Sequence, residues 1–138
     1  MIAYVDSSVI LRRILGQAGA LREWKHLETP VASALVEVEC LRTLDRLRIA
    51  GSIDDHRVSG WREAVYRLLG EAELVEVTRS VLARAAQPMP TALGTLDAIH
   101  LATALLWRER GASALVMATH DEALATAARA SGFAVVGV

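Results

Sequence analysis

The 138 residues carry a formal net charge of −1 and are 53% hydrophobic. This length suffices for one domain with a sizeable core, and the apolar content excludes a disordered chain. The near-neutral charge excludes a basic field over the whole fold, so any nucleic-acid binding must use a local patch. With a single cysteine, Cys40, and no recognisable signal peptide or membrane span, we expect a cytoplasmic protein forming one domain over residues 1–138.

The first half of the chain alternates short apolar runs with helical patterns. It predicts a strand over 2–5, a helix from about residue 9, a short helix over 20–27, a strand over 31–33, and helices over 34–49 and about 54–69. Ser7 and Ser8 are suited to cap the first of these helices. In helix 34–49, Val36, Cys40 and Leu44 recur at helical spacing and predict its buried face.

The second half continues the alternation. It predicts a strand over 74–78, a helix over 81–87, a helix over 96–110, a strand over 114–119, a helix from Asp121 to just before Gly132, and a strand over 133–138. Pro88 and Pro90 exclude regular structure between the two middle helices, and Thr95 is suited to cap the longer one. Strands that alternate with helices in this way favour an α/β fold with a parallel sheet and helices on both faces.

Four carboxylates fall at the ends of predicted strands or the starts of predicted helices. Asp6 follows the first strand, Asp121 follows strand 114–119, and Glu39 and Asp97 lie in early turns of helices. In a parallel sheet these positions share one edge, where ligands of α/β proteins bind, so the four side chains could converge. Each also has a purely structural interpretation, as a turn residue, an N-cap, a first-turn acid favoured by the helix dipole, or a solvent-exposed acid.

A cluster of carboxylates stays ionised only with a counterion, because like charges raise each other's pKa values. A hard divalent cation such as Mg²⁺ or Mn²⁺ fits oxygen ligands, whereas Zn²⁺ fits poorly. Cys40 stands alone, and no ligand pair at zinc spacing occurs among His26, His56, His100 and His120. Mg²⁺ held by carboxylates suits phosphoryl chemistry, since the metal activates water and stabilises charge on the scissile phosphate.

The segments around these four acids resemble the motifs of PIN-domain ribonucleases of the VapC toxin type. Residues 4–8 resemble the first acidic motif of that family, and residues 33–42 resemble the second, with Glu39 rather than Glu37 as the matching acid. Residues 95–104 are similar to the third motif and form the most specific segment, and residues 118–121 resemble the fourth. The motifs follow the family order over nearly the whole chain.

This resemblance implies a three-layer α/β/α sandwich with a central, mostly parallel five-stranded sheet, as a single PIN domain. It also implies an endoribonuclease that depends on Mg²⁺ or Mn²⁺. By the resemblance, Asp6, Glu39, Asp97 and Asp121 hold the metal and orient the attacking water, and Ser7 and Thr119 fix the carboxylates. An RNA substrate, a homodimer, a VapB-like antitoxin and no membrane association are implied as well.

Four further residues have open roles. Arg12 and Arg13, which follow the first motif, are candidate RNA contacts or solvated helix surface. His120 is a candidate phosphate contact or an exposed loop histidine. His100, three residues after Asp97, either orients that acid, touches RNA, or is a partly buried structural histidine.

Three rival interpretations remain at the level of sequence. The low charge motivates a catalytically inactive PIN-like module that acts through dimerisation and protein binding. A haloacid-dehalogenase-like phosphatase also begins with a strand and an aspartate, but it needs a second aspartate at the position of Ser8. A receiver domain is disfavoured because the only lysine, Lys25, lies outside any suitable strand end.

Overall fold

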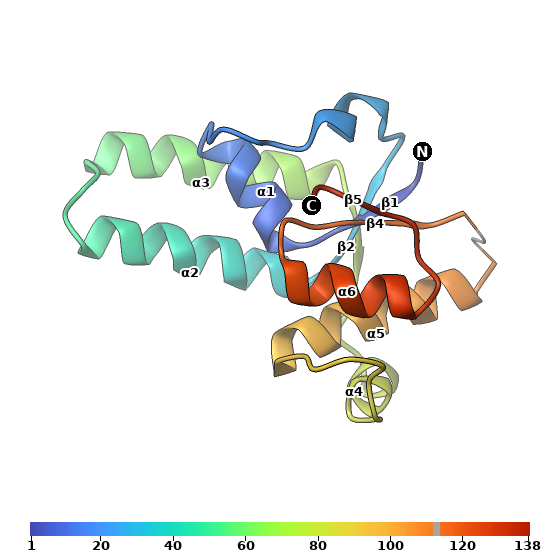
Figure 1. The fold of residues 1–138 in the computed structure, drawn as a ribbon. Coiled ribbons are helices and arrows are strands. Elements are labelled where there is room, and N and C mark those ends of the chain that lie inside the picture. The colour runs from blue at the N-terminus through green and yellow to red at the C-terminus, as the bar shows by residue number, and fades with distance from the viewer. Residues whose placement is uncertain (112–113) are drawn as a thin grey trace.

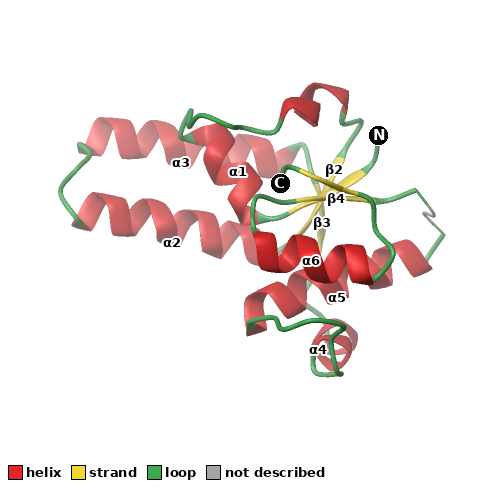
Figure 2. Cartoon of the chain, in the orientation of Figure 1, coloured by secondary structure: helices red, strands yellow, loops and turns green. Residues whose placement is uncertain are grey.

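The sheet has five short parallel strands, and the strand that precedes Asp6 lies at its centre (Figures 1 and 2). The computed structural model describes residues 1–111 and 114–138. The strands are β1 (Ala3–Val5), β2 (Pro30–Ser33), β3 (Glu73–Val75), β4 (Val116–Ala118) and β5 (Val135–Val136), in the order β3-β2-β1-β4-β5. Every pairing among them is parallel. The predicted five-stranded parallel sheet is therefore confirmed.

Helices cover both faces of this sheet, as Figure 1 shows. They are α1 (Ser7–Ile14), α2 (Leu35–Ile49), α3 (Asp55–Gly70), α4 (Arg79–Ala85), α5 (Thr95–Glu109) and α6 (Glu122–Ala130), with a 3₁₀ segment, η1 (Arg22–His26). The helices α1, α2 and α3 pack on one face, α5 and α6 pack on the other, and α4 packs on α5. The three-layer α/β/α architecture is thus confirmed. In the described part of the chain, no helix is long and apolar enough to cross a membrane.

The pleat of β1 divides the interior into two cores. Ala3 and Val5 belong to the core under α1–α3, whereas Tyr4 between them belongs to the core under α5 and α6. Leu44 of α2 and Leu101 of α5 are fully buried, one in each core. Burial of each such side chain contributes roughly 1.5–3 kcal/mol. Packing on both faces therefore holds β1 firmly, and with it the residue that follows.

The ends of several elements differ from the predictions. Asp6, rather than Ser7 or Ser8, caps α1, because its carboxylate accepts a hydrogen bond from the Val9 N–H at 3.2 Å. The predicted cap at Thr95 is wrong, since α5 begins at that residue and its N-cap is Gly94, which has no side chain to contribute. Segment 20–27 contains a 3₁₀ turn instead of an α-helix, and β3, β4 and β5 are shorter than expected.

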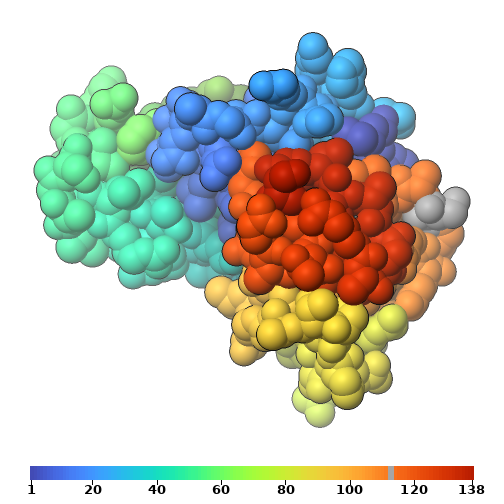
Figure 3. Space-filling model, in the orientation of Figure 1, coloured from blue at the N-terminus to red at the C-terminus, as the bar shows by residue number. Residues whose placement is uncertain are grey.

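The helices α2 and α3 form a hairpin that projects beyond the sheet as a lobe (Figure 3). Gly51, with φ of +76°, makes the turn between them.

Near the C-terminus, Gly137 passes so close to the residue after β4 that a β-carbon at Gly137 would lie 2.4 Å from the carbonyl oxygen of Thr119. The residue after β5 is therefore packed tightly against Thr119 of the fourth acidic segment.

Candidate active site

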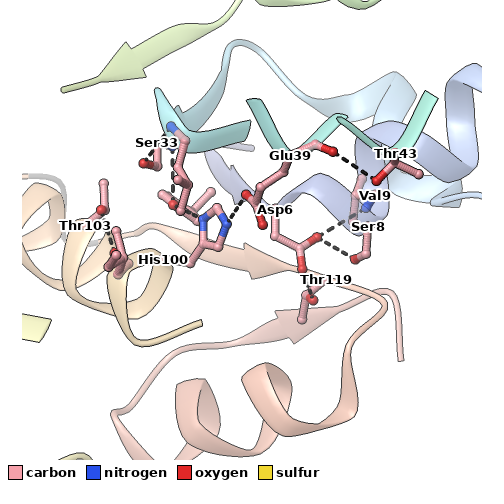
Figure 4. A network of polar contacts seen from close by, with 12 residues as sticks. Asp6, Ser8, Val9, Ser33, Glu39, Thr43, His100, Thr103 and Thr119 are labelled. Atoms are coloured by element: carbon pink, nitrogen blue, oxygen red, sulfur yellow. Dashed lines mark hydrogen bonds and ion pairs between the residues drawn. The ribbon is translucent and has the colours of Figure 1, made fainter. Parts of the chain in front are cut away.

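Asp6 lies where the strand order reverses, between the carboxyl ends of β1 and β4. Only 4% of its surface is exposed. As Figure 4 shows, its Oδ1 accepts hydrogen bonds from Ser8 Oγ at 2.5 Å and Val9 N–H at 3.2 Å, and its Oδ2 accepts one from Thr119 Oγ1 at 2.6 Å. A carboxylate offers about four lone-pair directions, so these three donors leave about one on Oδ2. Asp6 is thus fixed in orientation and can still accept a further bond.

Two hydroxyl groups tie the end of β1 to the segment after β4. Thr119 Oγ1 donates to Asp6 and accepts from the Asp121 N–H at 2.9 Å, and Ser8 Oγ donates to Asp6 and accepts from the His120 N–H at 2.9 Å. The contact that we expected from Thr119 is present. The contact that we expected from Ser7 is made by Ser8 instead, and Ser7 lines a shallow hollow beside Glu39.

Asp121 and Asp97 stand at the starts of two helices on the same edge. Asp121 is the N-cap of α6, where its Oδ1 accepts from the Leu124 N–H at 2.9 Å. Asp97 lies in the first turn of α5 and is half-buried. Burial raises the pKa of Asp97 above its usual value, and the negative charges of Asp121, Asp6 and Glu39 raise it further, against an opposing effect of His100. Asp97 therefore lies near enough to the other three acids to be affected by their charges.

Glu39 reaches this edge from α2 and is held by His100. The side chain of Glu39 is 17% exposed, whereas Glu37 points to solvent, in line with the choice of Glu39 as the motif acid. His100 Nε2 lies 2.6 Å from Glu39 Oε1 (Figure 4). His100 Nδ1 lies 2.7 Å from Tyr4 Oη. His100 thus contacts Glu39 rather than orienting Asp97 through a hydrogen bond.

Sequence reasoning missed the pairing of Tyr4 with His100. A signal for it was present, because Tyr4 is a hydroxyl-bearing residue in a strand that is otherwise apolar and covered on both faces. A buried tyrosine hydroxyl normally has a hydrogen-bond partner. The strand therefore indicated that a polar partner was needed, but no local pattern identified it as His100, 96 positions away.

Of the three candidate RNA contacts, the two arginines lie outside the acidic centre, the edge that carries the four acids, whereas His120 adjoins it, because it precedes Asp121 and its N–H donates to Ser8 Oγ. Arg12 and Arg13 occupy the last turn of α1, whereas Asp6 caps its first, and the Arg13 guanidinium lies over the Trp24 ring at 4.7 Å from its centroid. His120 Nδ1 lies 2.7 Å from the Gly137 carbonyl oxygen, so its ring faces the end of β5. RNA contact by Arg12, Arg13 and His120 stays a prediction.

The chemistry of the donors fits a hard divalent cation. Oxygen ligands dominate this edge, and burial, with Glu39 and Asp6 contributing, raises the pKa of the Cys40 thiol to about 12, so no thiolate is offered. Within residues 1–111 and 114–138, no three potential ligands stand close enough to one another to hold a metal ion. Mg²⁺ commonly uses one or two carboxylates and keeps several waters, so the free lone pair of Asp6 and the neighbouring acids are a suitable set.

We expect the raised pKa of Asp97 to appear in the stability of the metal-free protein. The folded state retains a proton that the unfolded state releases near the ordinary value of 3.8, so stability should fall as pH rises through the raised pKa. Asp97→Asn should remove this loss and raise the melting temperature at neutral pH by about 3 °C, a small effect because water screens a half-exposed group. Thermal unfolding across a pH series with chelator measures it.

The matched control for this prediction is Asp55→Asn. Asp55 also lies in the first turn of a helix, but it is exposed at the tip of the α2–α3 hairpin. The pH dependence of Asp55→Asn should follow that of the wild type. Parallel pH slopes for the wild type and Asp97→Asn would contradict the raised pKa of Asp97.

The fold and the site define a class: a parallel α/β domain with an acidic centre at the carboxyl edge of its sheet. The sequence matches the family model of the PIN domain over residues 3–130. It is also 34% identical over 136 residues to Ribonuclease VapC46 of Mycobacterium tuberculosis, an alignment that covers 96% of this chain and 95% of the relative. The chain therefore belongs to the PIN domain family, which sets aside the phosphatase and receiver interpretations.

Solved structures share this fold at low sequence identity. FitAcB from Neisseria gonorrhoeae aligns with a TM-score of 0.71 and 19% identity, covering 99% of this chain and 96% of that one. A toxin–antitoxin complex from Klebsiella pneumoniae aligns with a TM-score of 0.65 and 17% identity, covering 89% of this chain and 90% of that one. At these identities the likeness concerns the fold.

Proposed function

We propose that this chain is a divalent-metal-dependent endoribonuclease and the toxin of a VapBC-type toxin–antitoxin pair. The observation that supports the proposal is that Asp6, Glu39, Asp97 and Asp121 lie along one edge of the sheet, where burial and the charges of the other three acids raise the pKa of Asp97. Excess negative charge of this kind is relieved by a cation. The relative from Mycobacterium tuberculosis is a ribonuclease, which supports the reaction.

The four acids would share the work of holding Mg²⁺ or Mn²⁺ and the water. Asp6 is the most rigid of them, and its free Oδ2 lone pair is the natural direct ligand. Asp97 and Asp121 stand at the starts of α5 and α6 and would complete the set or bind through water. When bound, the cation supplies Lewis acidity toward the phosphate and lowers the pKa of water.

The other residues of the site prepare these acids for that task. Thr119 and Ser8 hold the Asp6 carboxylate with two hydroxyl donors, which fix its orientation. Oε1 of Glu39 is hydrogen-bonded to His100, which leaves Oε2 to orient the attacking water. The chain thereby provides a preorganised electrostatic environment for cleavage of a phosphodiester bond.

Cleavage of total RNA by the purified protein tests the proposal. We expect cleavage with Mg²⁺ or Mn²⁺, loss of cleavage with excess chelator, and recovery when the metal is restored. The rival, an inactive module that acts through protein contacts, gains if Mn²⁺ titration shows no saturable binding at millimolar concentrations. Saturable binding that is lost in Asp97→Ala contradicts the rival.

The proposed partner is a VapB-like antitoxin. The Klebsiella pneumoniae relative was solved as a toxin–antitoxin complex, which supports this assignment. Expression of the chain alone should arrest growth, and co-expression of a short neighbouring reading frame should relieve the arrest. The expected homodimer is tested by light scattering of the purified protein.

A further inference from the structure

A continuous chain of hydrogen bonds leads from the backbone of β2 to Glu39. The Ser33 N–H lies 3.2 Å from Tyr4 Oη, Tyr4 Oη lies 2.7 Å from His100 Nδ1, and His100 Nε2 lies 2.6 Å from Glu39 Oε1. Tyr4 is fully buried and His100 is 1% exposed. Only Glu39, at the far end, reaches the open edge of the sheet.

The donors along this chain point in one direction. The Ser33 N–H can only donate, so the Tyr4 oxygen accepts from it, and the Tyr4 O–H is then available to donate to His100 Nδ1. Burial raises the pKa of Tyr4 well above its usual value, so the phenol keeps its proton. With Nδ1 as the acceptor, the neutral imidazole carries its proton on Nε2 and donates it to Glu39 Oε1.

The opposite tautomer conflicts with the geometry. It would set the lone pair of His100 Nε2 against a carboxylate oxygen of Glu39 at 2.6 Å. It would also require Nδ1–H to donate to the Tyr4 oxygen, which already accepts from Ser33. The Tyr4 proton would then need another acceptor, such as the Thr103 hydroxyl. That hydroxyl itself donates to the Ile99 carbonyl at 2.7 Å. The arrangement with Nε2–H satisfies every group directly.

We propose that Tyr4 and His100 are positioning residues, which fix the imidazole as its Nε2–H tautomer and thereby aim Glu39 at the acidic centre. Tyr4 stands two residues before Asp6 on the central strand, so one strand places both acids: Asp6 directly, and Glu39 through Tyr4 and His100. The hydrogen bond from His100 occupies Glu39 Oε1 and leaves Oε2 for the metal or its water. This role in catalysis rests on the proposed metal-dependent function.

The tautomer can be measured in the metal-free wild type, before any variant is made. Nitrogen-15 NMR of the histidine ring distinguishes a protonated Nε2 from a protonated Nδ1, and correlations to the ring protons assign His100 among the four histidines. We expect His100 in the Nε2–H form. A wild-type signal from the Nδ1–H form would overturn the proposal, whatever the protein does to RNA.

Three substitutions then test the consequence for Glu39. Tyr4→Phe removes the hydroxyl that selects the tautomer, and we expect mixed tautomers of His100 and Mn²⁺ affinity lowered about 10-fold. His100→Asn places an amide near the Nδ1 position, where it cannot reach Glu39, and should weaken Mn²⁺ binding 10- to 100-fold. His100→Gln places an amide N–H near the Nε2 position and should recover most of the affinity.

Matched controls come from elsewhere in the chain. Tyr66→Phe removes the other tyrosine hydroxyl, which is exposed on α3, and His56→Gln changes an exposed histidine on the same helix. Both should bind Mn²⁺ and cleave RNA as the wild type does. In Tyr4→Phe we expect kcat to fall while KM for RNA stays the same, because Glu39 orients reacting groups rather than binding the polymer.

The outcomes separate this proposal from the proposed function. A wild type that binds Mn²⁺ and cleaves RNA, together with a folded Tyr4→Phe of unchanged Mn²⁺ affinity and kcat, would overturn the role of Tyr4 and leave the nuclease standing. A wild type that shows neither Mn²⁺ binding nor cleavage would overturn the nuclease, and with it the catalytic role of Glu39. Equal losses of Mn²⁺ affinity in His100→Asn and His100→Gln would show that the bulk of the side chain matters and not the donor at Nε2. That result would overturn the positioning role of His100.

Discussion

Asp6→Asn should lower metal-dependent RNA cleavage by on the order of 10³-fold or more while the protein stays folded. The substitution removes the negative charge and the free Oδ2 lone pair at the most rigid of the four acids. An amide nitrogen in place of Oδ2 cannot bind a cation. Initial cleavage rates on a defined RNA, with saturating Mn²⁺, measure the effect.

The fold should survive because asparagine caps a helix about as well as aspartate. The remaining amide oxygen can accept from Ser8 and from the Val9 N–H, and the Thr119 hydroxyl can rotate to accept from the new N–H₂ group. We therefore expect the free energy of unfolding of the metal-free protein to change by less than about 1 kcal/mol.

Asp54→Asn provides the matched control for Asp6→Asn. Asp54 caps α3 with the same geometry, accepting from the Arg57 N–H at 2.8 Å, but it lies exposed at the tip of the hairpin. Its variant should cleave RNA at the wild-type rate. Full activity in a folded Asp6→Asn protein would refute Asp6 as a metal ligand, and equal losses in both variants would point to helix capping instead.

Thr119→Val should cost both activity and stability. Valine has nearly the shape of threonine, so packing is retained, but Asp6 Oδ2 loses a donor and the Asp121 N–H loses an acceptor in a fully buried place. We expect activity to fall 10- to 100-fold and the free energy of unfolding to fall by about 1–3 kcal/mol. Chemical denaturation and RNA cleavage measure the two effects separately.

Thr126→Val is the comparison for Thr119→Val. The Thr126 hydroxyl donates to the Glu122 carbonyl at 2.8 Å on the exposed side of α6, so its loss leaves water free to replace it. Both the stability and the activity of this variant should remain near those of the wild type. A Thr119→Val protein with wild-type rates would show that Asp6 needs no hydroxyl on its Oδ2 side.

The sequence was enough to predict the order and type of the elements. Apolar runs bounded by glycine, proline and capping residues marked all five strands and most helices, and positions at strand ends and helix starts predicted that the four acids share one edge. These features are local, since each depends on residues a few positions apart. Errors fell on end residues such as Thr95, where Gly94 takes the cap, and on segment 20–27, which forms a 3₁₀ turn.

The details of the site depend on partners that are far apart in the chain. Tyr4 and His100 are separated by 96 positions, and Glu39 and His100 by 61, so no local pattern could pair them. The contact to Asp6 that was predicted for Ser7 is made by Ser8 for a similar reason. Because Asp6 caps α1, the position two residues later is the one turned back toward its carboxylate, and that depends on where the helix begins.

The hydrogen bond between Asp6 and Thr119 joins residues that are 113 positions apart in the chain. This separation determines when the chain can become active during its own synthesis. An emerging chain that ends before residue 116 lacks β4, the donor to Asp6 Oδ2 and the acid at position 121. Translation proceeds at about 5–20 residues per second, so the centre cannot form until β4 and Asp121 have been made and have folded against β1, seconds after Asp6 was made. A nuclease built in this way would be inactive while those residues are missing, and a product that ends between Asp97 and β4 would carry three of the four acids without a working site.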